Sequence, residues 1–362
     1  MAQATREYGE WPLKRLMTEV VGSGHKSAED MTREQAREAF LRILGDEPDH
    51  TTLGAFLLAN RWKRNTPEEL AAFVDIMAEE SVEVEAPSAD PVDCGANYDG
   101  KHTTAILGVA AGVVAAGAGT PVVTHSGDRV PTQKLDAYKH VLDELGVETD
   151  LTPGESADMV DDVGFGFYYQ PSFNPGIDAL WERRDMMGVR SFVNTIETLA
   201  NPADADVHLG SFYHLPFAKR MIKTLKQSES STVERALFFQ GMEGYDDIRP
   251  GATVVAEWPS TDGDADEAGI VDYEIRTSEY GMDLQAEDLE VEDVAADSAA
   301  IAKDVVAGEC EDDAFADAVE LNAALRIYAR EDVSSLDDGL AAARAAISDG
   351  SAAAVLDDLI EY

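Results

Sequence analysis

Apolar residues recur at helical spacing through the first part of the chain. The segment MTREQAREAFLRIL (residues 31–44) begins at Thr32, and a glutamine follows three residues later, which is the spacing of a capping box. Residues 66–69, TPEE, repeat that spacing with proline at the first helical position. Between these starts, TTLGAFLLANRWK (residues 51–63) places its leucine and phenylalanine side chains on one helical face. The pattern predicts a helical domain over residues 1–85.

After residue 92 the pattern changes to short β-rich runs that alternate with amphipathic stretches. The runs that predict strands are PVVTH (121–125), DVGFGFYYQP (162–171), VERALFFQG (233–241) and ATVVAEW (252–258). The stretches that predict helices are PTQKLDAYKHVLDELGV (131–147) and IDALWERRDMMG (177–188). Such alternation is typical of an α/β domain with a mainly parallel sheet, in which ligands bind at the carboxyl ends of the strands.

These patterns divide the chain into two domains joined by a linker, EAPSADP. The helical domain covers residues 1–85, and the α/β domain covers residues 92–362. Helices within residues 175–222 are expected to pack back on the helical domain. The acidic segment TDGDADEAGIVDYE (261–274) predicts a solvated loop or hairpin, and two helical stretches from residue 312 onward close the chain.

Charge and composition narrow the function classes. The chain has 362 residues, with Lys+Arg 28 against Asp+Glu 71 and a net charge of −43 spread along its length. Spread acidity of this kind favours a protein of a very salty cytoplasm, where screening reduces self-repulsion. It argues weakly against nucleic acid as a partner, because phosphate backbones are bound by basic patches, but strong salt suppresses that attraction in any case.

Neither membrane insertion nor a zinc site is expected from the sequence. The N-terminus has no apolar segment of the signal-peptide type. The uncharged run over residues 103–124 is rich in glycine and alanine, and it predicts a buried helix followed by a buried strand rather than a membrane span. Cys94 and Cys310 are far apart and form no CxxC motif, so we expect a reduced cytoplasmic protein.

The segment VDCGANYDGKH (residues 92–102) predicts a strand that runs into a glycine-containing loop. The following residues, TTAILGVAAGVVAAGAG (103–119), predict a helix packed beneath that loop. A helix N-terminus after such a turn presents unpaired N–H groups and can hold an anion. Ordinary strand-to-helix turns also carry Gly, Asn and Asp, so the motif leaves both interpretations open.

Three further groups of residues have chemistry that fits a site. Asp246 and Asp247 follow a glycine-rich turn and form a carboxylate pair able to bind Mg²⁺, although acidic neighbours are common in this composition. His125, at a predicted strand end, is either a ligand contact or a hydrogen-bonded structural residue. Arg184, next to Arg183, is able to bind a carboxylate bidentately or to pair at the surface.

Taken together, these segments resemble the anthranilate phosphoribosyltransferase family, within the fold shared with pyrimidine nucleoside phosphorylases. The resemblance rests on the helical segments before residue 85, on NPGIDALWERRDMMGVRSFVNTIETLANP, on QGMEGYDDI, and on the closing helices. It covers essentially the whole chain. It implies a small N-terminal helical domain that forms a dimer and a larger α/β domain with a mainly parallel sheet and C-terminal helices.

The resemblance also shows where this chain departs from its family. The family's GTGGDG loop, which binds the diphosphate of phosphoribosyl pyrophosphate, corresponds to GANYDG, in which Gly95, Asp99 and Gly100 match. The hydroxyl residues that follow in the family are replaced here by Ala105, Leu107 and Gly108. The family's KHGNR becomes THSGDR, which keeps His125, Gly127 and Arg129.

Other family positions are retained. The acidic pair for the second Mg²⁺ falls on Asp246 and Asp247, and the arginine associated with the anthranilate carboxylate falls on Arg184. Asn174 replaces the usual histidine on the acceptor side. The expected donor-binding set is Gly95, Asn97, Asp99, Gly100, Lys101, His102, Thr103, Thr104, His125 and Arg129, with Lys101 to Thr104 supplying replacement donors for phosphate.

The function implied is Mg²⁺-dependent transfer of a phosphoribosyl group from phosphoribosyl pyrophosphate to anthranilate, as in tryptophan biosynthesis. The alternative is a non-catalytic paralogue that binds a nucleotide or nucleic acid in the same cleft. It is supported by the lost hydroxyls and by YDGKHTT, which resembles a glycosyltransferase-like subfamily, some of whose members bind nucleic acid. A nucleoside phosphorylase is a third option, although the chain lacks that group's phosphate motif.

Overall fold

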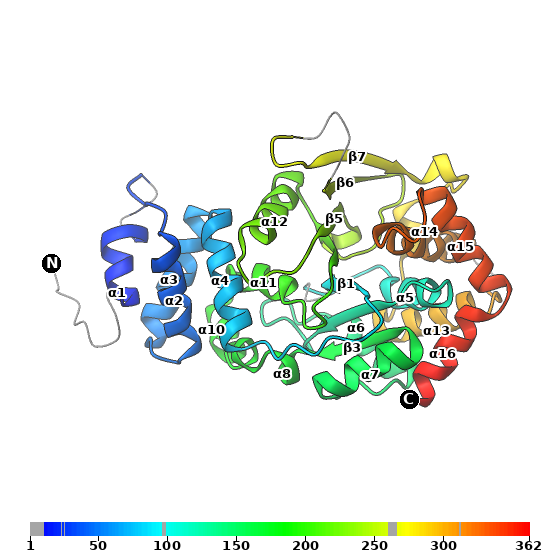
Figure 1. Ribbon diagram of the computed structural model, residues 1–362, viewed down its shortest axis with the longest axis horizontal. Coiled ribbons are helices and arrows are strands. Elements are labelled where there is room, and N and C mark those ends of the chain that lie inside the picture. Colours follow the sequence, from blue (N-terminus) through cyan, green and yellow to red (C-terminus); the bar gives the residue numbers. More distant parts are fainter. Residues whose placement is uncertain (1–10, 23, 25, 96–98, 260–265, 311–312) are drawn as a thin grey trace.

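The computed structural model describes residues 11–22, 24, 26–95, 99–259, 266–310 and 313–362. Figure 1 shows a helical bundle at one end, a sheet in the middle and the C-terminal helices at the other end. Among the described residues, no helix is both long and apolar enough to cross a membrane.

The bundle contains α1 (Leu13–Leu16), η1 (Met17–Val21), α2 (Arg33–Leu44), α3 (His50–Lys63) and α4 (Pro67–Glu80). Both predicted capping boxes are confirmed, since the side chains of Thr32 and Thr66 accept from the third helical N–H and the reciprocal bonds are present. In the bundle core, Phe73 stacks on Phe192 with ring centroids 4.1 Å apart. Phe192 precedes α11, so the bundle shares its core with the α/β domain.

A seven-stranded sheet forms the centre of the α/β domain, with the order β3-β2-β1-β4-β5-β6-β7. The first five strands of that order are parallel, and the last two pair antiparallel. Their bounds are β1 Val92–Gly95, β2 Val122–Ser126, β3 Phe165–Tyr169, β4 Val207–Phe212, β5 Arg235–Gln240, β6 Ala252–Trp258 and β7 Val271–Arg276. The expected α/β class with a mainly parallel sheet is confirmed, and the acidic segment ends in the β6–β7 hairpin.

The sheet has an apolar core on each face, because side chains alternate along a strand. In β5, Leu237 and Phe239 belong to one core, and Ala236 and Phe238 belong to the other. The first core is covered by α5 (Gly108–Gly117), α6 (Tyr138–Leu145), α13 (Val294–Val306), α14 (Asp313–Ala329), α15 (Leu336–Ser348) and α16 (Ser351–Glu361). The second is covered by α4, α7 (Pro153–Val163), α11 (Val193–Ile196) and α12 (Leu215–Gln227).

Two predicted helices begin later than expected. The helix expected from residue 131 starts at Tyr138, since Lys134 has a positive φ of 58° and Asp136 forms a β-bridge with Lys101. The helix expected from residue 103 starts at Gly108, because residues 102–107 form hydrogen bonds with distant elements instead. The stretch 177–188 is split into α9 (Pro175–Asp178) and α10 (Trp181–Met187).

Candidate donor and acceptor site

The predicted donor loop begins where β1 ends. A side chain at Gly95 would lie 2.1 Å from the carbonyl oxygen of Thr198, so only glycine fits there. Gly100 has a φ of 92°, which also favours glycine. Asn97 lies outside the described residues. Asp99 forms an ion pair with Arg190, so its charge is compensated within the chain.

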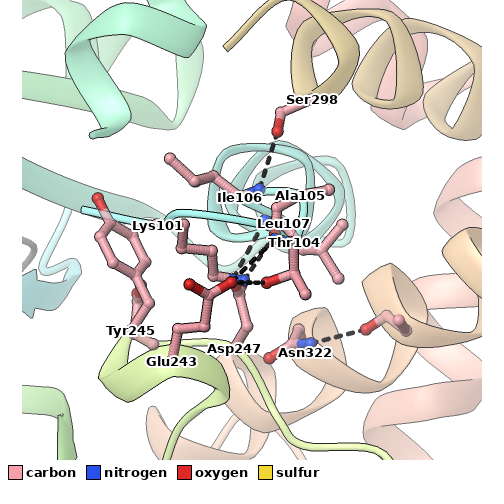
Figure 2. A network of polar contacts seen from close by, with 12 residues as sticks. Lys101, Thr104, Ala105, Ile106, Leu107, Glu243, Tyr245, Asp247, Ser298 and Asn322 are labelled. Atoms are coloured by element: carbon pink, nitrogen blue, oxygen red, sulfur yellow. Dashed lines mark hydrogen bonds and ion pairs between the residues drawn. The ribbon is translucent and has the colours of Figure 1, made fainter. Parts of the chain in front are cut away.

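An anion-binding turn is present in the loop, and a carboxylate of the chain itself lies in it. The N–H groups of His102, Thr103 and Thr104 donate to the Glu243 carboxylate over 2.9, 3.2 and 2.8 Å. The hydroxyls of Thr103 and Thr104 add bonds of 3.1 and 2.8 Å. Burial raises the pKa of Glu243, but these hydrogen bonds outweigh it and leave the pKa below its usual value. The site therefore holds a negative charge, and Figure 2 shows the Glu243 side chain directed at Thr104.

Lys101 lies directly behind this turn, with 2% of its surface exposed. Its ammonium group is 2.5 Å from Asp247 Oδ2 and donates over 2.6 Å to the carbonyl of Ala105. The N–H of Leu107 also donates to Asp247 over 3.3 Å. A buried ammonium and a buried carboxylate neutralise each other here (Figure 2), so Asp247 forms an internal ion pair.

Asp246, the other member of the acidic pair, has a separate cationic partner. Arg326 on α14 donates to Asp246 Oδ2 over 3.0 Å, and the hydroxyl of Tyr138 donates to the same oxygen over 2.5 Å. Burial raises the pKa of Asp246 to about 6, although Arg326 opposes the shift. Burial also raises the pKa of the Tyr138 hydroxyl well above its usual range, so Tyr138 remains a donor.

The acidic pair does not fit a resident Mg²⁺ ion. Oδ1 of Asp246 and Oδ1 of Asp247 are buried and accept no hydrogen bond from the residues the structure describes. Mg²⁺ requires near-octahedral oxygen ligands, whereas Oδ2 of Asp247 and Oδ2 of Asp246 are already paired with Lys101 and Arg326. Within the described ranges, no group of three or more His, Cys, Asp or Glu side chains is arranged to hold a metal.

His125 lies inside the sheet rather than in the loop. Its Nε2 is 3.3 Å from Oδ1 of Asp93 on β1, and Nδ1 of His208 on β4 lies 2.8 Å from Oδ2 of Asp93. Burial raises the pKa of Asp93, but the two imidazoles outweigh that effect and hold the pKa well below its ordinary range. The arrangement joins three neighbouring strands, which corresponds to the structural interpretation of His125.

The remaining predicted residues also have partners within the chain. The Arg184 guanidinium donates to both oxygens of Glu197 over 2.8 and 2.6 Å, and both side chains are buried. Asn174 Oδ1 accepts from the hydroxyl of Ser81 over 2.5 Å. Arg129 lies near the surface and pairs with Asp136 at 2.5 Å.

The loop therefore brings Lys101 to Thr104 together with Asp246 and Asp247, whereas His125, Arg129, Arg184 and Asn174 bond to other groups. The sequence analysis did not identify the counter-charges Glu197, Glu243 and Arg326. The sequence contained a signal for Arg326, because an arginine inside the apolar stretch NAALRIYA is unusual. In the structure Arg326 is fully buried. Charged side chains are almost never fully buried unless they are paired.

Comparison with known proteins agrees with this architecture. Residues 17–81 match the helical bundle domain of the glycosyl transferase family, and residues 88–353 match its a/b domain. The anthranilate phosphoribosyltransferases of Methanocorpusculum labreanum and Natronomonas pharaonis are each 32% identical to the chain over 92% of its length, and the matches cover 94% and 96% of their own lengths.

Solved structures show the same relationship. The crystal structure of anthranilate phosphoribosyltransferase from Thermus thermophilus has a TM-score of 0.80 and 25% identity, and covers 96% of this chain and 98% of its own. The Saccharomyces cerevisiae enzyme in complex with PRPP and Mg has a TM-score of 0.80 at 18% identity, with 96% and 97% coverage, which shows a shared fold.

Proposed function

Since the chain belongs to the glycosyl transferase family and is a glycosyltransferase-type enzyme, we propose that it transfers a phosphoribosyl group from phosphoribosyl pyrophosphate to an aromatic amine of the anthranilate type. The amine nitrogen forms a bond to ribose C1, the bond from C1 to the diphosphate oxygen breaks, and the amine loses a proton. In tryptophan biosynthesis, anthranilate is the acceptor in this reaction.

One observation supports the donor half of the proposal more than any other. Consecutive N–H groups from His102 to Thr104, with two hydroxyls, converge on a single anionic group. Backbone N–H groups arranged in this way stabilise the charge of a departing diphosphate without reorganising. In the free protein that place is taken by Glu243, so the diphosphate of the donor displaces this carboxylate when it binds.

The acceptor half depends on Arg184. A guanidinium group binds a carboxylate through two parallel hydrogen bonds, which is how Arg184 holds Glu197. The carboxylate of anthranilate would form the same pair, so it has to replace Glu197. Asp247 and Asp246 hold Lys101 and Arg326 in place through buried ion pairs. Because both carboxylates are paired in this way, the requirement for Mg²⁺ that the resemblance implies has to be measured.

The dimer and the cellular setting belong to the same proposal. Three large apolar side chains of the bundle are exposed, namely Leu41 (44%), Leu58 (40%) and Trp62 (76%), and a second copy of the chain would cover them. We expect Trp62→Arg to convert a homodimer into a monomer in light scattering after gel filtration, and unchanged mass would remove this face from the interface. The net charge of −43 fits a salty cytoplasm.

The transfer is tested with purified protein in multimolar KCl, phosphoribosyl pyrophosphate and anthranilate, with and without Mg²⁺, by following the loss of anthranilate fluorescence. Glu197→Gln removes the competing charge from Arg184 at nearly constant volume. We expect it to lower the KM for anthranilate about tenfold, since a charged hydrogen-bonded pair is worth about 1.5–3 kcal/mol. Turnover that is absent in both proteins under every condition would reject the proposal for this acceptor.

A second candidate function is binding without transfer, with a nucleotide or nucleic acid in the cleft. The observation that favours it is the internal pairing of Asp246, Asp247 and Arg184, which removes the charges on which family chemistry depends. Tight oligonucleotide binding together with no turnover in the same KCl would favour this candidate over transfer.

A further inference from the structure

Asp75 lies on α4, the helix at which the bundle meets the α/β domain. Its side chain is fully buried, and so are its neighbours on the helix over residues 69–77. A helix that is buried all round has packing partners on every side. Helix α4 packs against α2 of the bundle and against α12 of the α/β domain. A carboxylate buried at such a boundary requires partners for its charge.

One oxygen of Asp75 accepts four hydrogen bonds from the turn between α12 and β5. The N–H groups of Glu229 and Ser230 donate to Oδ1 over 2.8 and 3.1 Å. The hydroxyls of Ser228 and Ser230 donate to the same atom over 2.6 and 3.0 Å. Successive N–H groups that converge on one position form an anion-binding turn. The turn belongs to the α/β domain, whereas the anion in it belongs to the bundle.

The other oxygen of Asp75 pairs with two arginines of α2. Arg33 donates to Oδ2, and Nη1 of Arg37 lies 3.8 Å from the same atom. Arg33 also donates over 2.9 Å to the carbonyl of Gln227, and its Nε lies 3.2 Å from a carboxylate oxygen of Glu229. One buried and fully paired carboxylate therefore joins α2, α4 and the end of α12 in a single network.

The chain that follows α4 is also bonded to the α/β domain. This segment, residues 83–89, includes part of the predicted linker and is called the strap below. The N–H of Glu83 donates to the carbonyl of Phe173 over 2.7 Å. The N–H of Ser88 donates to the carboxylate of Asp161 on α7 over 2.9 Å. The bundle is therefore held to the α/β domain by two sets of bonds, one at Asp75 and one along the strap.

On the side of α3, the bundle borders open space. Arg64, at the end of α3, lines a cavity of about 780 Å³ at the carboxyl end of β4, and so does Phe217 on α12. A contact between the domains on this side, from the Arg61 side chain to the carbonyl of Arg190 over 2.8 Å, is exposed. The distance from α3 to α12 sets the width of the cavity, so the width depends on how the bundle is fixed at α4.

We propose that Asp75 is a positioning residue, which fixes the bundle on the α/β domain and so holds α3 at its distance from α12. A carboxylate whose partners lie in one domain stabilises that domain alone. A carboxylate bonded to both domains couples their positions, because neither can move without breaking its bonds. The consequence for catalysis rests on the proposed phosphoribosyl transfer, whereas the coupling of the domains does not.

Hydrogen exchange of the full-length protein, read by mass spectrometry at constant KCl, tests the coupling. Asp75→Asn keeps the size of the side chain and removes its charge. We expect the amides of Glu229 and Ser230 to exchange about tenfold faster or more in this variant, and those of the strap likewise. The strap amides donate to groups other than Asp75, so a purely local role of Asp75 would leave their exchange unchanged.

Glu69→Gln is the matched control, because Glu69 is a second buried carboxylate on α4 and its partners lie in the bundle. It accepts from the N–H groups of Met31 and Thr66, each over 2.9 Å, and pairs with Lys63 at 2.6 Å. This variant should lose stability without faster exchange of the strap. Equal acceleration of the strap in the two variants, or none in Asp75→Asn, would overturn the proposal.

A milder variant keeps the proposal testable where Asp75→Asn does not fold. The double variant Ser228→Ala, Ser230→Ala removes two donors from the turn and leaves the charge of Asp75 in place. We expect it to accelerate exchange of the strap about threefold or more. Ser231→Ala is its control, since the Ser231 hydroxyl accepts from the N–H of Val233. Equal exchange of the strap in the double variant and its control would contradict the proposal.

The transfer assay gives a readout that a loss of stability alone does not change. The cavity adjoins Asp99 and Glu243 of the donor site, but Asp75 touches none of the reacting atoms. With both variants folded, Asp75→Asn should raise the KM for phosphoribosyl pyrophosphate about fivefold and change kcat less than about twofold, whereas Glu69→Gln should change neither. A lower kcat at unchanged KM would overturn the positioning role. Absence of transfer in the wild type would reject the proposed function, and the exchange experiment would still decide the coupling.

Discussion

The two charged regions at the carboxyl edge of the sheet differ in how their charges are used. In the predicted donor site, Lys101 neutralises Asp247 and Arg326 neutralises Asp246 inside the protein. By contrast, Arg64 lines a cavity of about 780 Å³ at the carboxyl end of β4 and has no ion pair within the described part of the chain. The difference teaches that a charged residue at a family position is available to a ligand only where no other residue of the chain already pairs with it.

The largest effect on stability is expected from a substitution of Arg326, which tests whether the paired charges differ from the available ones. Arg326→Met leaves the Asp246 carboxylate buried without its cation, and removing one partner of a buried pair costs about 3–5 kcal/mol. Urea unfolding at constant KCl should show that loss. Arg64→Met, at the open cavity, is the contrasting variant and should change stability by less than about 0.5 kcal/mol or increase it. Equal losses in the two variants would contradict the distinction between paired and available charges.

A pH dependence of Asp246 is the next largest effect. Its folded pKa is raised to about 6 from a usual value near 4, so the folded state binds the extra proton between those values. Stability contributed by that proton is present below about pH 4 and lost as pH rises through about 6. The unfolding free energy of the wild type minus that of Asp246→Asn should therefore fall over this window, by at most about 3 kcal/mol. A difference that stays flat from pH 4 to 7 would show that Asp246 remains ionised.

Glu243→Gln tests the anion-binding turn by removing the negative charge that occupies it. The variant loses a charged acceptor for the N–H groups of residues 102–104, which should lower stability by about 1–2 kcal/mol. The turn then lacks its own negative charge, so diphosphate should bind about tenfold more tightly in a calorimetric titration. Glu287→Gln, an exposed change in η5 (Ala286–Leu289), serves as control. Diphosphate affinity equal to that of the wild type would mean that Glu243 does not compete with anions.

The smallest effect is expected at Arg64 itself. Arg64→Gly removes the strain of a side chain at a positive φ of 65° and should raise the free energy of unfolding by roughly 1 kcal/mol. A gain of stability would show that the backbone at Arg64 is strained in the wild type. A loss of stability would show instead that Arg64 packs structurally.

Much of the fold was predictable because its signals are local. Thr32 and Thr66 start their helices through contacts three residues away. Strands β1, β2, β3, β5 and β6 appear in the sequence as short apolar runs bounded by turn residues, whereas β4 was not predicted. Helix α13 was missed, although Asp293 caps it through the N–H of Ala296. The late start of α5 could not be predicted locally, since it depends on hydrogen bonds with residues far along the chain.

The sequence predicted which part of the sheet the candidate residues lie at, but not which residues they pair with. Glycine and carboxylate spacing placed Gly100, Asp246 and Asp247 at one edge of the sheet. Which of 71 carboxylates would lie in the turn, or which cations would pair with the acidic residues, depends on three-dimensional geometry. Arg326 is 80 residues from Asp246, and no spacing rule connects positions that far apart.

The loop after β1 also sets an order for biosynthesis. The N–H groups of His102, Leu107 and Ile106 bond to side chains that lie 141, 140 and 192 residues later in the chain. A ribosome therefore releases the loop long before it has made Glu243, Asp247 and Ser298. Until then the N–H groups of the loop bond to water, and their full set of protein partners is present only after residue 298 has been synthesised.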